Sequence, residues 1–225
     1  MTRRPGLFIK RMMDIGGALA LLAVFGVPML VLALLVRFKL GSPIIFRSPR
    51  IGQHAKTIYV YKFRSMLDLR DEQGKLLPDE QRLTRFCKIL RSTSLDELPQ
   101  IINILKGEMS FIGPRPILTD FYPYLNDKEL KRLEMLPGIT GLAQVNGRNS
   151  LEWDKRLEMD VWYVENWSLW LDIKVALKTL PVWLGGQGIN TPGFATFQRL
   201  DDCRTPARPA LDQHSEPVAH KTANV

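Results

Sequence analysis

The strongest constraint on the fold is an uninterrupted apolar run near the start of the chain. Residues 15–36, IGGALALLAVFGVPMLVLALLV, carry no polar side chain. As an α-helix this run reaches about 33 Å, which is enough to cross the hydrocarbon core of a bilayer. A cleaved signal peptide has an apolar stretch of only roughly 7–15 residues and a small-residue cleavage site, and neither feature matches. The run therefore predicts a membrane segment.

Basic residues flank the apolar run on both sides. They are Arg3, Arg4, Lys10 and Arg11 before it, and Arg37, Lys39, Arg47 and Arg50 after it. Because cytoplasmic flanks carry the excess of positive charge, this pattern draws both ends to the cytoplasmic side. Pro28 lacks a backbone donor and predicts a kink inside the run. A re-entrant helix-break-helix satisfies both observations, and a straight span with a tolerated proline is the alternative that these residues leave open.

The rest of the chain predicts a compact body of the mixed, helix-rich α/β class with short strands. Strands are expected at 43–46 and 57–63, joined by a turn-rich stretch and followed by an exposed loop at 68–80. Apolar residues at helical spacing predict helices around 83–90 and from Ser94 to 105, and a capped helix opening at 126. Ser150 is expected to cap a further helix.

These patterns divide the chain into three parts. The membrane segment and its basic flanks occupy residues 1–40, and the soluble body occupies residues 41–200. Residues 201–225 are polar, contain prolines and lack apolar periodicity, so we expect a disordered tail there.

All five tryptophans lie in the last third of the body, at Trp153, Trp162, Trp167, Trp170 and Trp183. Tryptophan favours the headgroup zone of a membrane because it combines an apolar body with a polar tip. A buried helix pair would have a similar composition. Because the same chain carries a membrane segment, we predict amphipathic helices that lie at the membrane interface.

Charge and composition restrict the chemistry. The net charge of +8 favours anionic partners such as phosphates, nucleic acid or acidic lipid. Nucleic acid is disfavoured because the basic residues are dispersed and no aromatic stacking motif accompanies them. Cys87 and Cys203 form no C-x-x-C pair, and His54 is the only histidine outside the tail. We therefore expect a reaction that uses carboxylates and basic side chains.

Asp96 and Glu97, in RSTSLDELPQ, are the candidate reactive carboxylates. A purely structural interpretation is available, because Ser94 and Glu97 match a capping box in which each side chain bonds the other residue's amide. Pro99 argues against it, since it lies too deep for the favoured first helical position. Adjacent carboxylates can hold a divalent cation through oxygen ligands while one of them attacks phosphorus.

A reaction at phosphorus also requires cations that bind phosphate oxygens. The candidates stand beside glycine, proline and small polar residues, and they are Lys62, Arg64, Arg91, Arg115 and Arg148. Any one of them alone is more often a solvated surface charge. Their repeated setting is what predicts a shared anion pocket.

Six stretches of this sequence resemble motifs of the bacterial sugar transferase family, the monotopic phosphoglycosyl transferases. They are KRMMD, YKFRSM, RSTSLDELPQ, GEMSFIGPRP, PGITGLAQVNGRN and DVWYVENWS, in the family's order. The resemblance covers about residues 8–190. Many relatives have Ser-Pro where this chain has Val27-Pro28, and the tail after about residue 190 matches nothing in the family.

The resemblance implies a re-entrant membrane helix and a compact body on the cytoplasmic face of the bacterial inner membrane. It implies Mg²⁺-dependent transfer of a phosphosugar from a UDP-sugar to undecaprenyl phosphate, with release of UMP, as the first membrane step of glycoconjugate or polysaccharide assembly. Asp96 would be the nucleophile that carries a covalent intermediate, with Glu97 beside it. Lys62, Arg91, Arg115 and Arg148 would line the phosphate and nucleotide region. Larger relatives carry further membrane helices and another domain, so the resemblance implies the minimal catalytic form.

Two other functions are compatible with parts of the sequence. A non-catalytic, membrane-anchored module could bind nucleotide or acidic lipid through its basic face, with Asp96 and Glu97 serving only as a helix cap. A conventional glycosyltransferase with a spanning anchor would pass a sugar without its phosphate. The two enzymes differ in the nucleotide they release, which is UDP for the glycosyltransferase and UMP for the phosphosugar transferase.

Overall fold

The computed structural model describes residues 5–147, 151–185 and 199–211. It is a mixed structure of helices and short strands, as the sequence predicts. The α-helices are α1 (Pro5–Leu40), α2 (Asp79–Arg82), α3 (Arg85–Ser92), α4 (Gln100–Lys106), α5 (Leu142–Val145), α6 (Trp153–Glu165) and α7 (Leu169–Gly185). The strands are β1 (Ile45–Ile51), β2 (Thr57–Phe63), β3 (Ser110–Ile112) and β4 (Gly138–Thr140). The described residues also form four short 3₁₀ helices: η1 (Gln53–Ala55), η2 (Leu95–Glu97), η3 (Thr119–Tyr124) and η4 (Glu129–Glu134).

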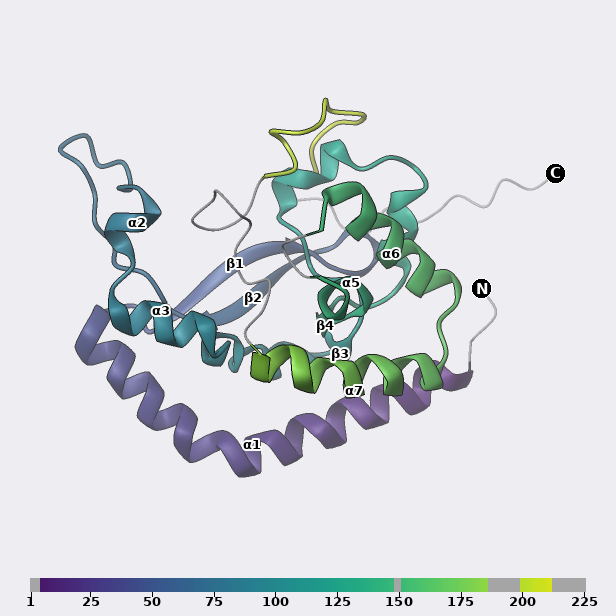
Figure 1. The fold of residues 1–225 in the computed structure, drawn as a ribbon, viewed down its shortest axis with the longest axis horizontal. Coiled ribbons are helices and arrows are strands. Elements are labelled where there is room, and N and C mark those ends of the chain that lie inside the picture. The colour runs from purple at the N-terminus through teal and green to yellow at the C-terminus, as the bar shows by residue number, and fades with distance from the viewer. Residues whose placement is uncertain (1–4, 148–150, 186–198, 212–225) are drawn as a thin grey trace.

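Helix α1 lies along the underside of the body and is bent near its middle (Figure 1). It is long and apolar enough to cross a membrane, and Pro28 lies inside it. The residues left a helix-break-helix and a straight span open, and the family resemblance implied the broken form. The structure has one continuous helix that bends. Phe8, Val24, Val27, Leu30 and Phe38 are each at least 67% exposed on it. A helix that turns this much apolar surface outward is typical of one that lies in lipid.

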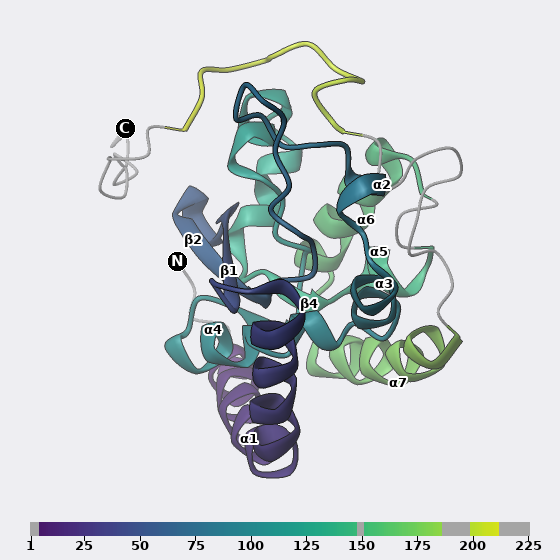
Figure 2. The ribbon, with the colours of Figure 1, turned by 90° about the vertical axis from the view of Figure 1, so that its left-hand side faces the viewer.

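The other side of α1 packs against the body along both of its arms. Ala18 belongs to a buried cluster with residues of β2 and α4, and Val36 and Leu40 to another with Phe63 of β2 and Leu90 of α3. The body therefore rests in the concave side of the bend, and α1 projects below it (Figure 2).

Polar contacts fix the first arm of α1. Lys10 Nζ donates to Ile112 O at 2.8 Å and forms a buried ion pair with Asp172 at 2.7 Å. The Arg11 guanidinium donates to the carbonyls of Ile104 and Leu105 at the C-terminal end of α4, at 2.6 and 3.0 Å. These contacts explain why charged residues directly precede an apolar run, because they join it to the body.

Strands β1 and β2 form an antiparallel hairpin, in register from Ile45 opposite Phe63 to Ile51 opposite Thr57. The predicted second strand is confirmed. The first was placed at 43–46 but extends to Ile51, because much of the stretch predicted as a turn pairs with β2. The Asn103 side chain covers the free edge of β2, donating to Tyr59 O at 2.8 Å and accepting from Tyr61 N at 3.0 Å.

Strands β3 and β4 bring the GPRP and PGITG motifs together as a short parallel pair. A Cβ atom on Gly138 would lie 2.1 Å from Gly113 N, and one on Gly141 would lie 2.1 Å from Gly113 O. Glycine is therefore required where these two backbones cross. This close approach fixes the loop that carries Arg115.

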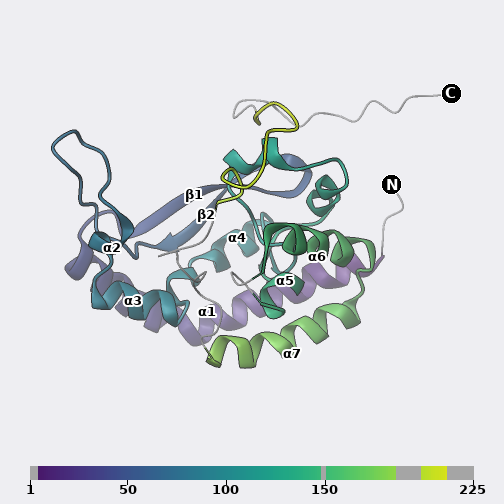
Figure 3. The same cartoon turned by 45° about the horizontal axis from the view of Figure 1, so that its top comes forward.

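Helix α7 runs beside α1 (Figures 1 and 3). Trp170, Ile173, Leu177 and Leu180 are exposed along it, while Trp167 Nε1 donates to buried Asp172 at 3.2 Å. The side chain of Trp183 lies outside the described residues. The exposed apolar stripe of α7 is the kind of surface that the interfacial prediction requires.

The segment from 126 begins with the predicted reciprocal cap, because Asn126 Oδ1 accepts from Glu129 N at 3.0 Å and Glu129 Oε2 accepts from Asn126 N at 2.9 Å. The helix that follows is the 3₁₀ helix η4, not an α-helix. The cap predicted at Ser150 lies outside the described residues.

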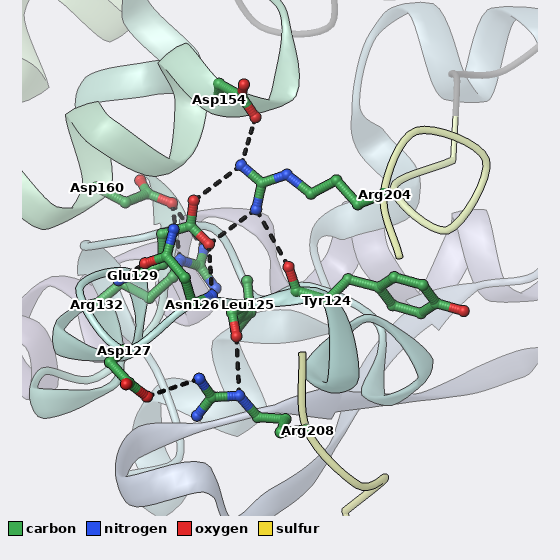
Figure 4. A network of polar contacts seen from close by, with 10 residues as sticks. All are labelled: Tyr124, Leu125, Asn126, Asp127, Glu129, Arg132, Asp154, Asp160, Arg204 and Arg208. Carbon is green, nitrogen blue, oxygen red and sulfur yellow. Dashed lines mark hydrogen bonds and ion pairs between the residues drawn. The ribbon is translucent and has the colours of Figure 1, made fainter. Parts of the chain in front are cut away.

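Residues 201–211 belong to the segment that the sequence predicted to be disordered, but the structure gives them defined contacts. Arg204 pairs with Glu129 and Asp154, and Arg208 pairs with Asp127 (Figure 4). Just before them, Leu200 is fully buried among apolar residues that include Phe121 and Leu157. Single arginines, unlike apolar periodicity, give no local signal of packing, so the sequence does not predict these contacts.

Candidate active site

Three separate segments meet around Glu97. Lys62 comes from β2, Glu97 from η2 and Arg115 from the loop after β3. Lys62 Nζ lies 2.6 Å and Arg115 Nη2 lies 2.9 Å from the same carboxylate oxygen, Glu97 Oε1. Two of the predicted phosphate-binding cations thus converge on the predicted carboxylate pair.

The capping-box interpretation of this segment is wrong. Ser94 has a φ of 56° and its side chain makes no capping hydrogen bond. The Glu97 side chain does not reach back to it, because Lys62 and Arg115 both hold it. A Glu97 side chain that served only as a cap would not require two cations from distant parts of the chain.

The role assigned to Pro99 is also corrected. The sequence pattern predicts this proline deep inside a helix, but η2 ends at Glu97 and α4 begins at Gln100, so Pro99 lies at the junction. Proline is well tolerated at a helix start because its missing N–H would have no intrahelical partner there. Pro99 therefore gives no separate evidence for a reactive site, which is supported by the contacts of Glu97 instead.

The two neighbouring carboxylates differ in acidity. Burial raises the pKa of Asp96 to about 6, and the negative charge of Glu97 contributes to the increase while Lys62 and Arg91 oppose it. Burial acts in the same direction on Glu97, but Lys62 and Arg115 outweigh it and hold the pKa of Glu97 well below its ordinary value. Asp96 therefore titrates near neutral pH while Glu97 stays ionised, a separation often found between adjacent groups in active sites.

The other predicted cations have different positions. Arg91, at the end of α3, carries a positive charge that opposes the rise in the pKa of Asp96. The Arg64 guanidinium does not join the cluster. It donates to Met66 O at 3.1 Å and to Ser42 O at 2.6 Å, and so links the segment that precedes β1 to the segment that follows β2. Arg148 lies outside the described residues.

Arg50 is a member of the site that the sequence analysis named only as a flanking charge. It lies opposite Ile58 in the hairpin, so it shares a sheet face with Lys62, four pairs further along. Burial and the neighbouring charge of Arg115 lower the pKa of Arg50 to about 10, while Glu97 opposes the change. The place of Arg50 on this sheet face follows from the register of β1 on β2. The sequence does not predict it, because Arg50 lies in the stretch predicted as a turn.

The site offers few ligands for a metal ion. Among the described residues no group of three or more His, Cys, Asp or Glu side chains could hold one. Mg²⁺ commonly binds through one or two carboxylates together with substrate phosphates and water. Asp96 makes no ion pair within the described part of the chain, so its buried carboxylate and that of Glu97 fit such a shared site.

Taken together, the cluster combines a buried carboxylate, a neighbouring carboxylate whose pKa is held low, and a surrounding set of cations. Lys62, Arg50, Arg91 and Arg115 supply positive charge for an anionic substrate. A carboxylate whose charge is costly to bury is poised either to accept a proton or to attack an electrophile.

Comparison with known proteins gives a consistent picture. The model of a family described as bacterial sugar transferase matches residues 6–186. An uncharacterized sugar transferase of Bacillus subtilis, EpsL, is 46% identical over 194 residues, which are 86% of this chain and 96% of the relative. The undecaprenyl-phosphate galactose phosphotransferase of Salmonella typhimurium is 37% identical over 84% of this chain and 43% of its own length. The UDP-glucose:undecaprenyl-phosphate glucose-1-phosphate transferase of Klebsiella pneumoniae is 41% identical over 76% of this chain and 39% of its own. The chain thus spans nearly all of one relative and less than half of the other two.

Proposed function

Because the chain belongs to the bacterial sugar transferase family, we propose that it moves a phosphosugar from a UDP-sugar to undecaprenyl phosphate. The products are undecaprenyl-diphospho-sugar and UMP, and the reaction opens the assembly of a glycoconjugate or polysaccharide. The observation that carries this proposal is the buried Asp96 beside Glu97, which two cations clamp. The reactions named for the Salmonella and Klebsiella relatives support it.

The proposed reaction consists of two displacements at one phosphorus atom. In the first, a carboxylate oxygen of Asp96 attacks the phosphorus that bears the sugar, and the bond from that phosphorus to the bridging oxygen breaks, so that UMP leaves with the electron pair. In the second, a phosphate oxygen of undecaprenyl phosphate attacks the same phosphorus and releases the Asp96 carboxylate. Two substrates of very different polarity can then use one site in turn.

The basic residues have distinct parts in this scheme. Lys62 and Arg115 hold Glu97 in place in the free protein, and in this proposal they bind the diphosphate of the donor. Arg50 adds positive charge that acts on Glu97, and Arg91 adds positive charge that acts on Asp96. Positive charge that is fixed before the substrate binds stabilises the additional negative charge of the transition state without further reorganisation.

We propose Mg²⁺ as the cofactor, with Asp96 and Glu97 as the residues that would hold it. Bound there, it would neutralise charge on the diphosphate. The protein supplies the carboxylates and the surrounding cations, and the substrate oxygens would complete the coordination.

A nucleotide-release assay tests the function and the metal together. Protein in lipid nanodiscs is supplied with undecaprenyl phosphate, Mg²⁺ and each of a panel of UDP-sugars. We expect one or a few donors to yield UMP, and we expect excess chelator to abolish turnover and Mn²⁺ to restore part of it. Release of UDP would identify a conventional glycosyltransferase, and full activity in chelator would remove the metal from the mechanism. Tight binding without turnover would favour the non-catalytic module, which the relatives' names do not support.

We further propose that α1 enters the membrane from the cytoplasmic side and returns to it. Its bend, the positive charge on both flanks and the exposed apolar residues of both arms support this arrangement. The body and α7 would then lie at the cytoplasmic face of the inner membrane, with the exposed Trp170 at headgroup level.

The topology is tested by labelling. A cysteine is introduced at Thr2 in a chain whose Cys87 and Cys203 are replaced by serine. It should react with a membrane-impermeant maleimide only after the inner membrane is permeabilised, which gives the reagent access to the cytoplasmic side. A second introduced cysteine in the exposed loop, at Asp71, should behave in the same way. Labelling of position 2 alone from the periplasm would show that α1 spans the membrane.

A further inference from the structure

The C-terminal segment at residues 199–211, here called the strap, lies beyond residue 186, where the match to the family model ends. It crosses η3 and η4 and is held there at several points. Ala207 N donates to Pro123 O at 2.7 Å, and Arg208 Nε donates to Leu125 O at 2.8 Å. Leu200 is fully buried in the same cluster as Ile117, two residues after Arg115.

Arg204 is the residue of the strap that joins other elements to one another. Its guanidinium donates to both carboxylate oxygens of Glu129 at 2.8 and 2.9 Å, and to Tyr124 O at 3.1 Å. It also pairs with Asp154 in the first turn of α6 (Figure 4). One planar group thus links the end of η3, the start of η4 and the start of α6, which suits the fork geometry of arginine.

The same two elements, η4 and α6, are joined further along by Arg132 and Asp160. Both side chains are buried, and Arg132 Nη2 lies 2.7 Å from Asp160 Oδ2. Arg132 Nη2 also donates to the backbone carbonyl of Arg115 at 2.6 Å. The backbone that carries Arg115 is therefore fastened to the η4–α6 pair.

These contacts form a continuous series from the strap to the candidate active site. Arg204 holds Glu129 at the start of η4, Arg132 follows one turn later and holds Arg115, and the Arg115 side chain holds Glu97. We propose that the strap is a positioning element of the enzyme, in which Arg204 acts through η4 to fix where Arg115 meets the diphosphate of the donor. This proposal rests on the proposed function, since it takes Arg115 as a phosphate-binding group.

The physical reason is the side chain of Arg115, which is 49% exposed and has its contact with Glu97 at its tip. The direction of such a side chain is set by the position of its backbone, and Arg132 of η4 holds that backbone through the Arg115 carbonyl. A guanidinium that binds phosphate bidentately is sensitive to small displacements, because both hydrogen bonds must form together. If η4 loosens against α6, we expect donor binding to weaken before the chemical step does.

The test compares Arg204→Gln with Arg70→Gln in the full-length protein in nanodiscs. Arg70 is an exposed arginine in the 68–80 loop, so the second variant loses the same charge outside the strap. We expect Arg204→Gln to raise the KM for the UDP-sugar roughly 3- to 30-fold, with a smaller change in kcat. Arg70→Gln should match the wild type, because the Arg70 side chain bonds to Asp68 and Gly74 of its own loop. Arg204→Lys should recover only part of the loss, because it keeps the charge but not the fork. Arg132 is not substituted, since its loss would leave Asp160 buried without its cation.

A double-mutant cycle shows whether Arg204 acts through Arg115. In the background of Arg115→Gln, adding Arg204→Gln should change the KM by less than about twofold, because the group it positions is absent. An equal effect in both backgrounds would overturn the proposal. So would unchanged kinetic constants in an Arg204→Gln protein that merely melts at a lower temperature.

Hydrogen exchange separates failure of this proposal from failure of the proposed function. If the wild type releases no UMP from any donor, the proposed function fails, and the strap is then judged by amide exchange alone. Exchange in peptides covering residues 110–118 and 126–134 should rise in Arg204→Gln and not in Arg70→Gln. If exchange is unchanged there, the strap does not hold the Arg115 loop.

Discussion

Asp96→Asn is expected to reduce turnover by on the order of 10⁴-fold or more, as loss of a nucleophile does in other enzymes that use covalent catalysis. Asparagine keeps the shape of the side chain but cannot supply the anionic oxygen that forms the intermediate. The variant should therefore also fail to release UMP from the UDP-sugar when no lipid acceptor is present. Wild-type protein under the same conditions should retain a sugar-derived radiolabel on a peptide that contains Asp96. Asp68→Asn, at an exposed aspartate, serves as the control.

The same substitution is expected to stabilise the folded protein at neutral and alkaline pH. Burial raises the pKa of Asp96 from 3.8 to about 6, so the folded state holds this proton more tightly than the unfolded state does. The stability that the protonated group contributes is complete below pH 3.8 and is lost as the pH rises through 6. Above pH 6 the buried charge costs about 3 kcal/mol, which asparagine does not incur. The melting temperature of Asp96→Asn should exceed that of the wild type at pH 8 and match it at pH 3.5.

Two outcomes would contradict this assignment. If no label is trapped and initial rates fit a ternary complex, Asp96 is a metal ligand or a base in a direct transfer. If Asp96→Asn keeps its turnover at wild-type level, the buried carboxylate has only a structural role. A variant that is inactive and also less stable at pH 8 would indicate a disturbed site, and its inactivity would not count as evidence for a nucleophile.

Glu97→Gln is expected to lower kcat/KM roughly 10²- to 10³-fold, the usual cost of removing one group that organises charge in an active site. Glutamine carries no charge to balance Lys62 and Arg115, so the positive charge of these two cations is left uncompensated at the site. The second expected effect is on pH dependence. The charge of Glu97 helps to raise the pKa of Asp96, and Lys62 opposes that increase. Without Glu97 the pKa of Asp96 should therefore fall.

The measurement is the pH profile of kcat/KM. The wild type should lose activity as the pH falls through about 6, where Asp96 becomes protonated. In Glu97→Gln the residual activity should persist to lower pH. Glu80→Gln, at an exposed glutamate of α2, should leave the profile unchanged. An acid limb that stays in place, or moves to higher pH, would show that Asp96 is not the titrating group.

The overall plan of the chain could be predicted from its sequence because the relevant signals are local. An apolar helix such as α1 is visible in any window of residues 15–36, and the hairpin strand β2 shows its own alternation. The cap at Asn126 and Glu129 is equally local, since its two residues are three positions apart. Asp96 and Glu97 could be singled out for the same reason, together with a set of cations whose positions were not yet known.

Only the tertiary structure decided what these residues do to one another. Glu97 could equally well cap its own helix or bind distant cations, and the choice depends on Lys62 and Arg115, which lie 35 and 18 positions away. Arg50 belongs to the site and Arg64 does not for a similar reason. Hairpin register puts Arg50 on the sheet face of Lys62, whereas carbonyl oxygens bind the Arg64 guanidinium. The strap shows the same limit, since Arg204 gains its partners 75 and 50 positions away only after η4 and α6 have packed. Charge interactions act through distance in space, whereas sequence patterns record distance along the chain.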